Sequence, residues 1–314
     1  MTPSSRHCTL TLVALVVAIS GCQPEFDGEF RHRSVLERST NGLVLHDDGG
    51  AGHAGMMGSN CPFETDFGLV TGDYDLPDED EEVQDIGSHV LGSNSILLVQ
   101  PNTINVLNKM TGEYATDIMH VPDAVAGRFF DEGIVALLRG DDSCMVDWID
   151  DDGNETTIET GDCSPGSFDV DPQTGTAYLG GPVAVEIVTP AGSIDAEVSG
   201  DLVAWDPSAE VTYVATLDGD LVEAIEPDGT LRWSTAVPGI VKVLAPAGNK
   251  GAAAVMLEQR DGGGLLVYLD GWTGDQISKL ETPSAAKGLA VSANGGNIAM
   301  ILNDQTHFYG VYVK

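Results

Sequence analysis

The chain has 314 residues, of which 42 % are hydrophobic, 20 % charged and only 6 % aromatic, so it can fold but has few large side chains for its core. Asp and Glu outnumber Lys and Arg by 49 to 14, which gives a formal net charge of −35. A field of this sign repels nucleic acid and anionic lipid surfaces, so we expect neither as a binding partner of the folded domain. It favours basic peptides, cationic ligands or simple solubility.

The N-terminus has the pattern of an export signal. Arg6 supplies a positive charge, and Leu10–Ile19 form a mainly apolar stretch. Ten residues span about 15 Å as a helix, roughly half the hydrocarbon core of a bilayer, so this stretch is too short for a transmembrane anchor. The pattern predicts that residues 1–21 are a signal peptide and are removed.

The signal ends with Ile19, Ser20 and Gly21 directly before Cys22. These four residues resemble the lipobox of bacterial lipoproteins. The resemblance implies cleavage before Cys22, a diacylglycerol on its thiol, and an acyl chain such as palmitate on its new amino group. By the same resemblance, Gln23 in place of an Asp implies the outer membrane rather than the inner one. The alternative is an ordinary secretory signal with an incidental cysteine.

Residues 22–82 lack a sustained apolar pattern. The segment Asp47–Gly52 and the acidic run Asp78–Glu82 cannot bury enough apolar surface to offset chain entropy. We therefore expect a flexible spacer, in which Gly42–Leu45 and Phe67–Val70 could add strands to an edge. Four residues here could hold a soft metal through imidazole and thioether groups, but their Gly-rich surroundings give no rigid frame and we expect no metal site: His46, His53, Met56 and Met57.

From residue 83 to 314, short apolar runs alternate with turn residues. Each run is rich in Val, Ile, Leu or Tyr and is bounded by Gly, Pro, Asn or Asp, and no stretch sustains helical spacing over a dozen residues. The sequence therefore predicts an all-β domain. The expected strands are Ile96–Gln100, Ile104–Leu107, Gly133–Leu138, Met145–Ile149, Thr176–Leu179, Val183–Val188, Val211–Thr216, Leu221–Ile225, Ala252–Leu257, Leu265–Leu269, Ile298–Leu302 and Phe308–Val313.

These runs form a repeat of about 40 residues, which with four strands per unit is typical of a β-propeller blade. A turn glycine marks each unit, with spacings of 41, 39, 37 and 45 residues between Gly112, Gly153, Gly192, Gly229 and Gly274. The segments Gly219–Trp233 and Gly288–Ile301 resemble the quinoprotein-like and lactonase-like propeller repeats of WD40 or YVTN type.

The repeat implies about six four-stranded blades, with units at 84–122, 123–163, 164–200, 201–239, 240–284 and 285–314. The last unit is one strand short. Propellers often close with a strand from the N-terminal end of the domain, which removes an exposed edge, and Glu82–Ile86 or Phe67–Thr71 could supply it. A degenerate blade within residues 30–80 would make seven. A pair of β-sandwiches is the alternative, and the 40-residue period argues against it.

The cysteines predict one disulfide. Cys144 lies nine residues before Gly153 and Cys163 ten residues after it, so a hairpin would place them opposite each other. Directly opposed residues can meet the Cα separation of about 4.4–6.8 Å that a disulfide needs, and exported proteins meet an oxidising environment. We predict a Cys144–Cys163 disulfide, which leaves Cys61 as a free thiol or an intermolecular link.

The sequence contains no catalytic motif that assigns a reaction. The acidic segment Asp147–Glu155 fails the ligand spacing of a calcium-binding loop, so we interpret it as an acidic hairpin tip. Lactonase-type propellers hold a metal in the central channel, and Asp169, Asp206 and Asn303 are conceivable analogues without a motif match. We therefore assign no catalytic residue, metal or cofactor.

The expected protein is a monomeric, lipid-anchored propeller that binds a protein, peptide or glycan at the cell envelope without catalysis. The alternative is a metal-dependent lactonase or lyase. Carboxylates and histidines that converge on one mouth of the channel would favour that alternative.

Overall fold

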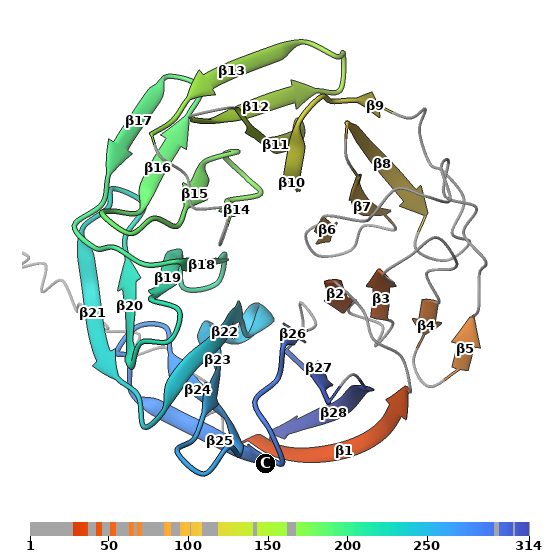
Figure 1. The fold of residues 1–314 in the computed structure, drawn as a ribbon, viewed down its shortest axis with the longest axis vertical. Coiled ribbons are helices and arrows are strands. Elements are labelled where there is room, and N and C mark those ends of the chain that lie inside the picture. The colour runs from red at the N-terminus through yellow and green to blue at the C-terminus, as the bar shows by residue number, and fades with distance from the viewer. Residues whose placement is uncertain are drawn as a thin grey trace, which may run out of the picture.

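The computed structural model describes residues 28–36, 42–45, 51–54, 63–65, 68–70, 85–88, 95–100, 102–108, 119–140, 143–161, 168–291, 295–303 and 305–313. Seven four-stranded antiparallel sheets stand around a central axis, with one strand of each sheet at the centre (Figure 1). This arrangement confirms the predicted all-β propeller and fixes the number of blades at seven. Among the described residues, no helix is long and apolar enough to span a membrane.

The blades follow one another in chain order around the ring. Blade 1 comprises β2 (Gly42–Leu45), β3 (Ala51–Ala54), β4 (Phe63–Thr65) and β5 (Gly68–Val70). Blade 2 comprises β6 (Asp85–Ser88), β7 (Ser95–Gln100), β8 (Thr103–Asn108) and β9 (Met119–His120). Blade 3 comprises β10 (Ala124–Phe130), β11 (Gly133–Arg139), β12 (Cys144–Asp150) and β13 (Glu155–Glu159). Blade 4 comprises β14 (Phe168–Val170), β15 (Ala177–Leu179), β16 (Glu186–Thr189) and β17 (Gly192–Asp195). Blade 5 comprises β18 (Leu202–Asp206), β19 (Val211–Ala215), β20 (Leu221–Ile225) and β21 (Leu231–Ala236). Blade 6 comprises β22 (Ile240–Pro246), β23 (Ala252–Glu258), β24 (Gly264–Asp270) and β25 (Gln276–Thr282). Blade 7 comprises β26 (Gly288–Val291), β27 (Asn297–Leu302), β28 (Gln305–Val313) and the N-terminal strand β1 (Gly28–Leu36).

The six repeat units expected from the sequence correspond to blades 2 to 7, and the last unit does lack one strand. The repeated turn glycine lies between the third and fourth strands of its blade or, for Gly192, is the first residue of the fourth strand. Four of these glycines have a backbone φ between 74° and 137°, a region that residues with a Cβ rarely adopt: Gly153, Gly192, Gly229 and Gly274. Gly112 lies outside the described residues.

The structure corrects the expected spacer over residues 22–82 and confirms the alternative of a degenerate blade within residues 30–80. Strands β2 to β5 form blade 1, and β1 is the outer strand of blade 7, where it pairs with β28 from Gly28↔Val313 to Leu36↔Thr306. The closing strand is therefore β1, and neither Glu82–Ile86 nor Phe67–Thr71. Strands β3, β4 and β5 have only three or four residues each, too few for an alternating apolar pattern to stand out from a loop.

The core lies between the blades. Each cluster of buried apolar side chains is shared by two neighbours, as between blades 4 and 5, where the rings of Tyr178 and Trp205 stack with centroids 5.3 Å apart. Buried indole groups add hydrogen bonds across these interfaces: Trp148 Nε1 donates to the Gly175 carbonyl at 2.7 Å, and Trp233 Nε1 donates to the Gly271 carbonyl at 2.9 Å. The ring is consequently stabilised blade against blade.

The two ends of the ring differ in which turns they carry. We name the strands of a blade A to D from the innermost outward. One end, the B–C end, carries the turns between strands B and C and the connections from strand D to the next blade. The opposite A–B end carries the A–B and C–D turns, including the short 3-10 helix η1 (Gly248–Lys250).

Candidate functional site

Exposed apolar side chains gather on the B–C end of blades 4 to 6. Among the residues whose burial is described, seven large hydrophobic side chains are exposed, and four of them lie on this end. Single exposed apolar residues are common on proteins, but a group on one end of consecutive blades is typical of a binding surface. We call these four residues the apolar patch: Val183 (90 % exposed), Leu217 (46 %), Leu221 (41 %) and Ile240 (42 %).

Backbone hydrogen bonds join the turns that carry the patch. The turn with Val183 is bridged through Gly181 to Gly200, beside Asp201. The Asp201 carboxylate accepts a 3.0 Å hydrogen bond from the N–H of Leu217. Next to Leu217, the N–H of Asp218 donates to the Val241 carbonyl at 3.0 Å, which holds this turn against the start of β22. The patch therefore rests on three blades that are fixed to one another.

Charged side chains border the patch toward blade 6. Lys242 Nζ lies 2.7 Å from Asp218 Oδ1 and 2.8 Å from Glu258 Oε2, so it links blade 5 to blade 6. The hydrogen bonds to Asp218 and then to Glu258 raise the pKa of Lys242. Beside this group an open depression of about 460 Å³ is lined by Lys242, Glu258, Gly262 and the segment 284–287. The lining of the depression reaches the connection between blades 6 and 7, and it includes none of the four patch residues.

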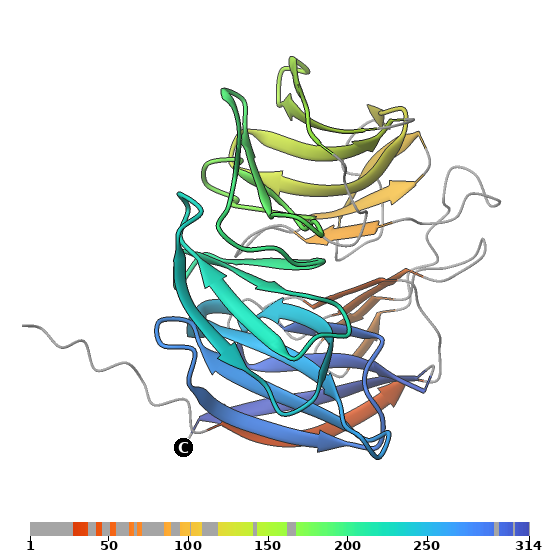
Figure 2. The ribbon, with the colours of Figure 1, turned by 60° about the vertical axis from the view of Figure 1, so that its left-hand side comes forward.

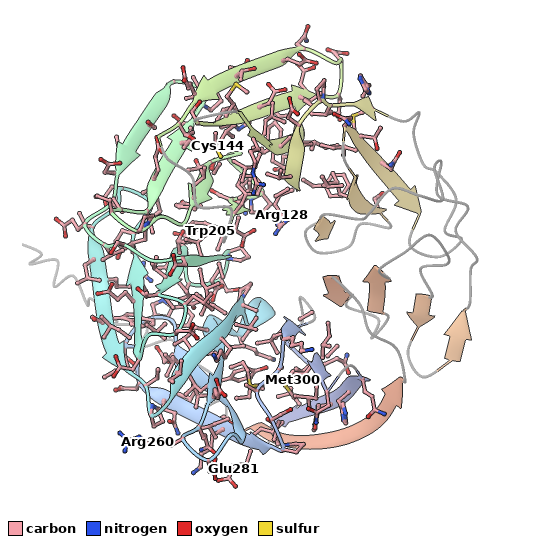
Figure 3. All side chains as sticks on the ribbon, in the orientation of Figure 1. Arg128, Cys144, Trp205, Arg260, Glu281 and Met300 are labelled. Carbon is pink, nitrogen blue, oxygen red and sulfur yellow. The ribbon has the colours of Figure 1, made fainter. Side chains whose placement is uncertain are left out.

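The channel wall carries a second polar arrangement. Arg128 on β10 and Trp205 on β18 lie on the inner side of the ring (Figure 3). Arg128 Nε is 3.4 Å from Asp169 Oδ1, and Arg128 Nη2 donates to the Phe168 carbonyl at 3.2 Å. Asp169 Oδ2 accepts a 2.8 Å hydrogen bond from the backbone N–H of Trp205. Each contact joins the inner strand of one blade to that of the next. The arrangement ties blades 3, 4 and 5 together at the channel.

The three conceivable metal ligands do not meet. Asp169 is paired with Arg128 at the channel, Asp206 has no exposed surface, and Asn303 is exposed in the turn after β27 at the B–C end. Asp206 Oδ2 accepts a 2.6 Å hydrogen bond from the Tyr213 hydroxyl, and burial raises the pKa of its carboxyl group. In the described part of the chain, no group of three His, Cys, Asp or Glu residues is placed to hold a metal ion. The described residues therefore show no convergence of carboxylates and histidines of the kind that would favour the lactonase alternative.

The acidic segment that resembles a calcium loop forms the turn between β12 and β13, as the hairpin interpretation predicts. The carboxylate of Asp150 forms hydrogen bonds within this turn. Its Oδ1 accepts from the backbone N–H groups of Asp152 and Asn154, and its Oδ2 accepts from Asn154 Nδ2. The Asn154 side chain foremost lowers the pKa of Asp150.

Of the five cysteines, Cys144 alone belongs to the described residues. It is buried at the start of β12 and takes part in a disulfide. The residue that we expected as its partner, Cys163, lies outside the described residues, so the pairing stays a prediction. The lipobox residues Ile19, Ser20, Gly21 and Cys22 also lie outside them, as do Cys61, His46, Met56 and Met57. His53 lies on β3, where only the backbone is described.

Sequence reasoning missed the apolar patch, although a signal for it exists. Val183 stands in a Gly-Gly-Pro-Val turn and Leu217 precedes Asp-Gly-Asp. Both turns place an apolar residue among Gly, Pro or Asp, where a hydrophobic side chain has little core to enter. Whether such a residue is exposed depends on neighbouring blades, and a single sequence does not show these.

The comparisons with known proteins support the fold. No protein-family model matches the chain, and no curated protein sequence matches it. Solved structures do: the β-propeller domain of Cps50 (Swd1) from Myceliophteria thermophila has a TM-score of 0.69 at 10 % identity, covering 90 % of this chain and 100 % of that one. The WD40 repeats of RRP9 give 0.69 at 10 % identity, covering 90 % and 98 %. The C-terminal WD40 domain of Sif2 gives 0.63 at 11 % identity, with the same coverage. At such identities the likeness shows a WD40-type propeller fold alone.

Proposed function

We propose that this chain is a lipid-anchored binding module of a bacterial cell envelope, and that a protein or peptide partner docks on the B–C end of blades 4 to 6. The apolar patch is the observation that carries this proposal. WD40-type propellers commonly serve as scaffolds for protein interactions, which agrees with a function in binding rather than catalysis. A glycan is a weaker candidate, because the patch offers aliphatic side chains rather than aromatic rings.

Charge indicates what kind of segment the surface accepts. Asp218, Asp220 and Glu258 border the patch within a chain of net charge −35. Lys242 pairs with both Asp218 and Glu258, so two carboxylates share one lysine and an excess of negative charge remains beside the patch. An apolar anchor flanked by Lys or Arg would bury the patch and meet this excess charge. Charge complementarity of this kind speeds association and discriminates against acidic partners, while the buried apolar centre supplies most of the affinity.

The docking surface can be tested with a matched pair of variants. Leu217→Asp places a charge in the patch, whereas Ile194→Asp places the same charge on β17, on another exposed apolar residue (52 % against 46 %). The mature domain is used to capture partners from solubilised envelope. We expect Leu217→Asp to lose the captured partner and Ile194→Asp to keep it. Equal capture by both variants would refute docking at the patch.

Anchoring has its own test. The proposed lipid on Cys22 holds the protein at a membrane, with the outer membrane as the expected location. Several acyl chains give stable attachment, because each buried methylene contributes about 0.8 kcal/mol. Cys22→Ala should move the protein from the membrane fraction to the soluble fraction. If the variant stays with the membrane, the lipid anchor is refuted while the docking surface remains open to the test above.

A further inference from the structure

The proposed lipid anchor and the closing strand of the propeller are neighbours in the sequence. Strand β1 begins at Gly28, so five residues separate it from Cys22. β1 is not a free arm, because it forms the outer strand of blade 7 along its full length beside β28 (Figure 2). The membrane attachment of the protein, as proposed above, is therefore a short tether fixed to a rigid element.

The sheet register shows at which end of the ring this tether begins. The turn between β27 and β28 is a B–C turn, so Gln305 lies at the B–C end and Val313 at the A–B end. Gly28 pairs with Val313, which places the start of β1 at the A–B end. The tether therefore leaves the ring at the end opposite the apolar patch.

The reach of the tether excludes an orientation in which the B–C end faces the bilayer. Six residue steps from Cys22 to Gly28 span at most about 21 Å. The eight steps of β1, from Gly28 to Leu36, cover about 27 Å from the A–B end to the B–C end. A ring with its B–C end against the bilayer would need the tether to run back along the whole of β1, which it cannot do.

Charge keeps the A–B end from adhering to the membrane. The described turns of this end carry nine acidic residues and one basic residue, Lys250. Asp171 is buried and Glu226 pairs with Arg232 near the start of β21, which leaves seven exposed acidic residues: Asp131, Glu132, Asp151, Asp152, Glu210, Asp228 and Asp275. Such a surface is repelled by anionic headgroups over roughly the Debye length, about 8 Å at physiological ionic strength. Charge therefore does not hold this end against the bilayer, and the tether does.

We infer that the anchored propeller turns its A–B end toward the membrane and presents the B–C end, with the apolar patch, to a partner on the aqueous side. This inference rests on the proposed lipid on Cys22. It adds to that proposal which face is presented, and it excludes the lipid surface as the occupant of the patch.

Two fluorescent labels on one blade test the orientation. A fluorescent amino acid replaces Asp275 at the A–B end or Asp261 at the B–C end of blade 6, both exposed and joined by β24, which is about 20 Å long. The full lipidated protein is placed on vesicles of phosphatidylethanolamine and phosphatidylglycerol that contain a nitroxide-headgroup lipid. We expect loss of fluorescence at the Asp275 position and none at the Asp261 position.

The outcomes separate anchoring from orientation. If the lipidated protein does not float with the vesicles, both the anchor and the inference fail. If it floats but the Asp261 label is quenched as much as the Asp275 label, the orientation alone is overturned. A further variant carries ten Gly and Ser residues between Asp27 and Gly28, so that the tether can reach past β1. It should lose the difference between the two labels, and an unchanged difference would show that the tether does not set the orientation.

Discussion

The buried pair of Asp206 and Tyr213 allows a quantitative test of how blade 5 is stabilised. The Asp206 carboxylate has no exposed surface and accepts three hydrogen bonds: from the Tyr213 hydroxyl at 2.6 Å and from the N–H groups of Ser208 and Ala209 at 2.8 and 3.2 Å. Tyr213→Phe removes only the hydroxyl group and keeps the packing of the ring against Trp233. The variant therefore isolates one hydrogen bond to a buried carboxylate.

The expected loss follows from the chemistry of this bond. A hydrogen bond to a charged group contributes roughly 1.5–3 kcal/mol, so Tyr213→Phe should lower the free energy of unfolding by about 2 kcal/mol. With an unfolding entropy of about 2.1 cal/mol/K per residue over the mature chain, the thermal midpoint should fall by about 3 °C. Chemical denaturation and a thermal melt measure both quantities.

The pH dependence distinguishes this explanation from a general packing defect. Burial raises the pKa of Asp206, and the Tyr213 hydroxyl partly offsets that rise. A carboxyl group with a raised pKa in the folded state stabilises the fold below its unfolded pKa, and this contribution is lost as pH rises through the folded pKa. Without the hydroxyl the folded pKa rises further. The loss caused by Tyr213→Phe should therefore grow as pH rises through the folded pKa of Asp206.

Asp206→Asn provides the control, because its amide keeps hydrogen-bonding groups at this site but carries no charge. In that background Tyr213→Phe should lower stability by only about 1 kcal/mol, independently of pH. If the loss in the native background is equally independent of pH, an ionised Asp206 is not what the hydroxyl stabilises and the reasoning is wrong.

Two other changes test single features of the blades. At Gly274, where φ is +74°, a Cβ would meet Thr235 Oγ1 at 2.5 Å and the Trp233 ring at 2.7 Å, whereas at Gly153, with φ +78°, it would meet nothing within 4 Å. Gly274→Ala should therefore lower the free energy of unfolding by about 3 kcal/mol, and Gly153→Ala by only about 1–2 kcal/mol, in parallel urea titrations. Equal losses would show that the contact with Thr235 and Trp233 of the neighbouring blade does not matter at Gly274. The predicted Cys144–Cys163 disulfide should appear as one cross-linked peptide in non-reducing mass spectrometry, and its removal should destabilise the protein by about 3 kcal/mol. A Cys144 peptide linked to Cys61 would contradict the assignment.

Much of the fold could be predicted because a blade repeats within the chain. Four strands and a turn glycine recur every 40 residues or so, and both the apolar runs and the positive φ at Gly153 or Gly229 are local requirements. The boundaries of blades 2 to 7 follow from this local pattern. The need for one strand from elsewhere in the chain to complete the last blade also follows, since the last unit has only three apolar runs.

Blade 1 and the closing strand could not be found in the same way. β3, with the sequence Ala-Gly-His-Ala, and β4, with Phe-Glu-Thr, are strands through their place beside longer neighbours in the ring. Their propensity for β-structure is weak, so tertiary context decides their conformation. The same holds for β1, whose partner β28 lies at the other end of the sequence.

The sequence by itself determined the all-β repeat, because the repeat depends on residues that are close together in the chain. The lipid on Cys22 also follows from a local pattern, and it stays a prediction. Only the tertiary structure decided that there are seven blades, that the patch of Val183, Leu217, Leu221 and Ile240 gathers on one end, and that β1 begins at the other. These features depend on which blades meet and on how a ring closes. The segment that we expected to be a flexible spacer contains blade 1 and the closing strand β1. Closing the ring with β1 removes an exposed sheet edge.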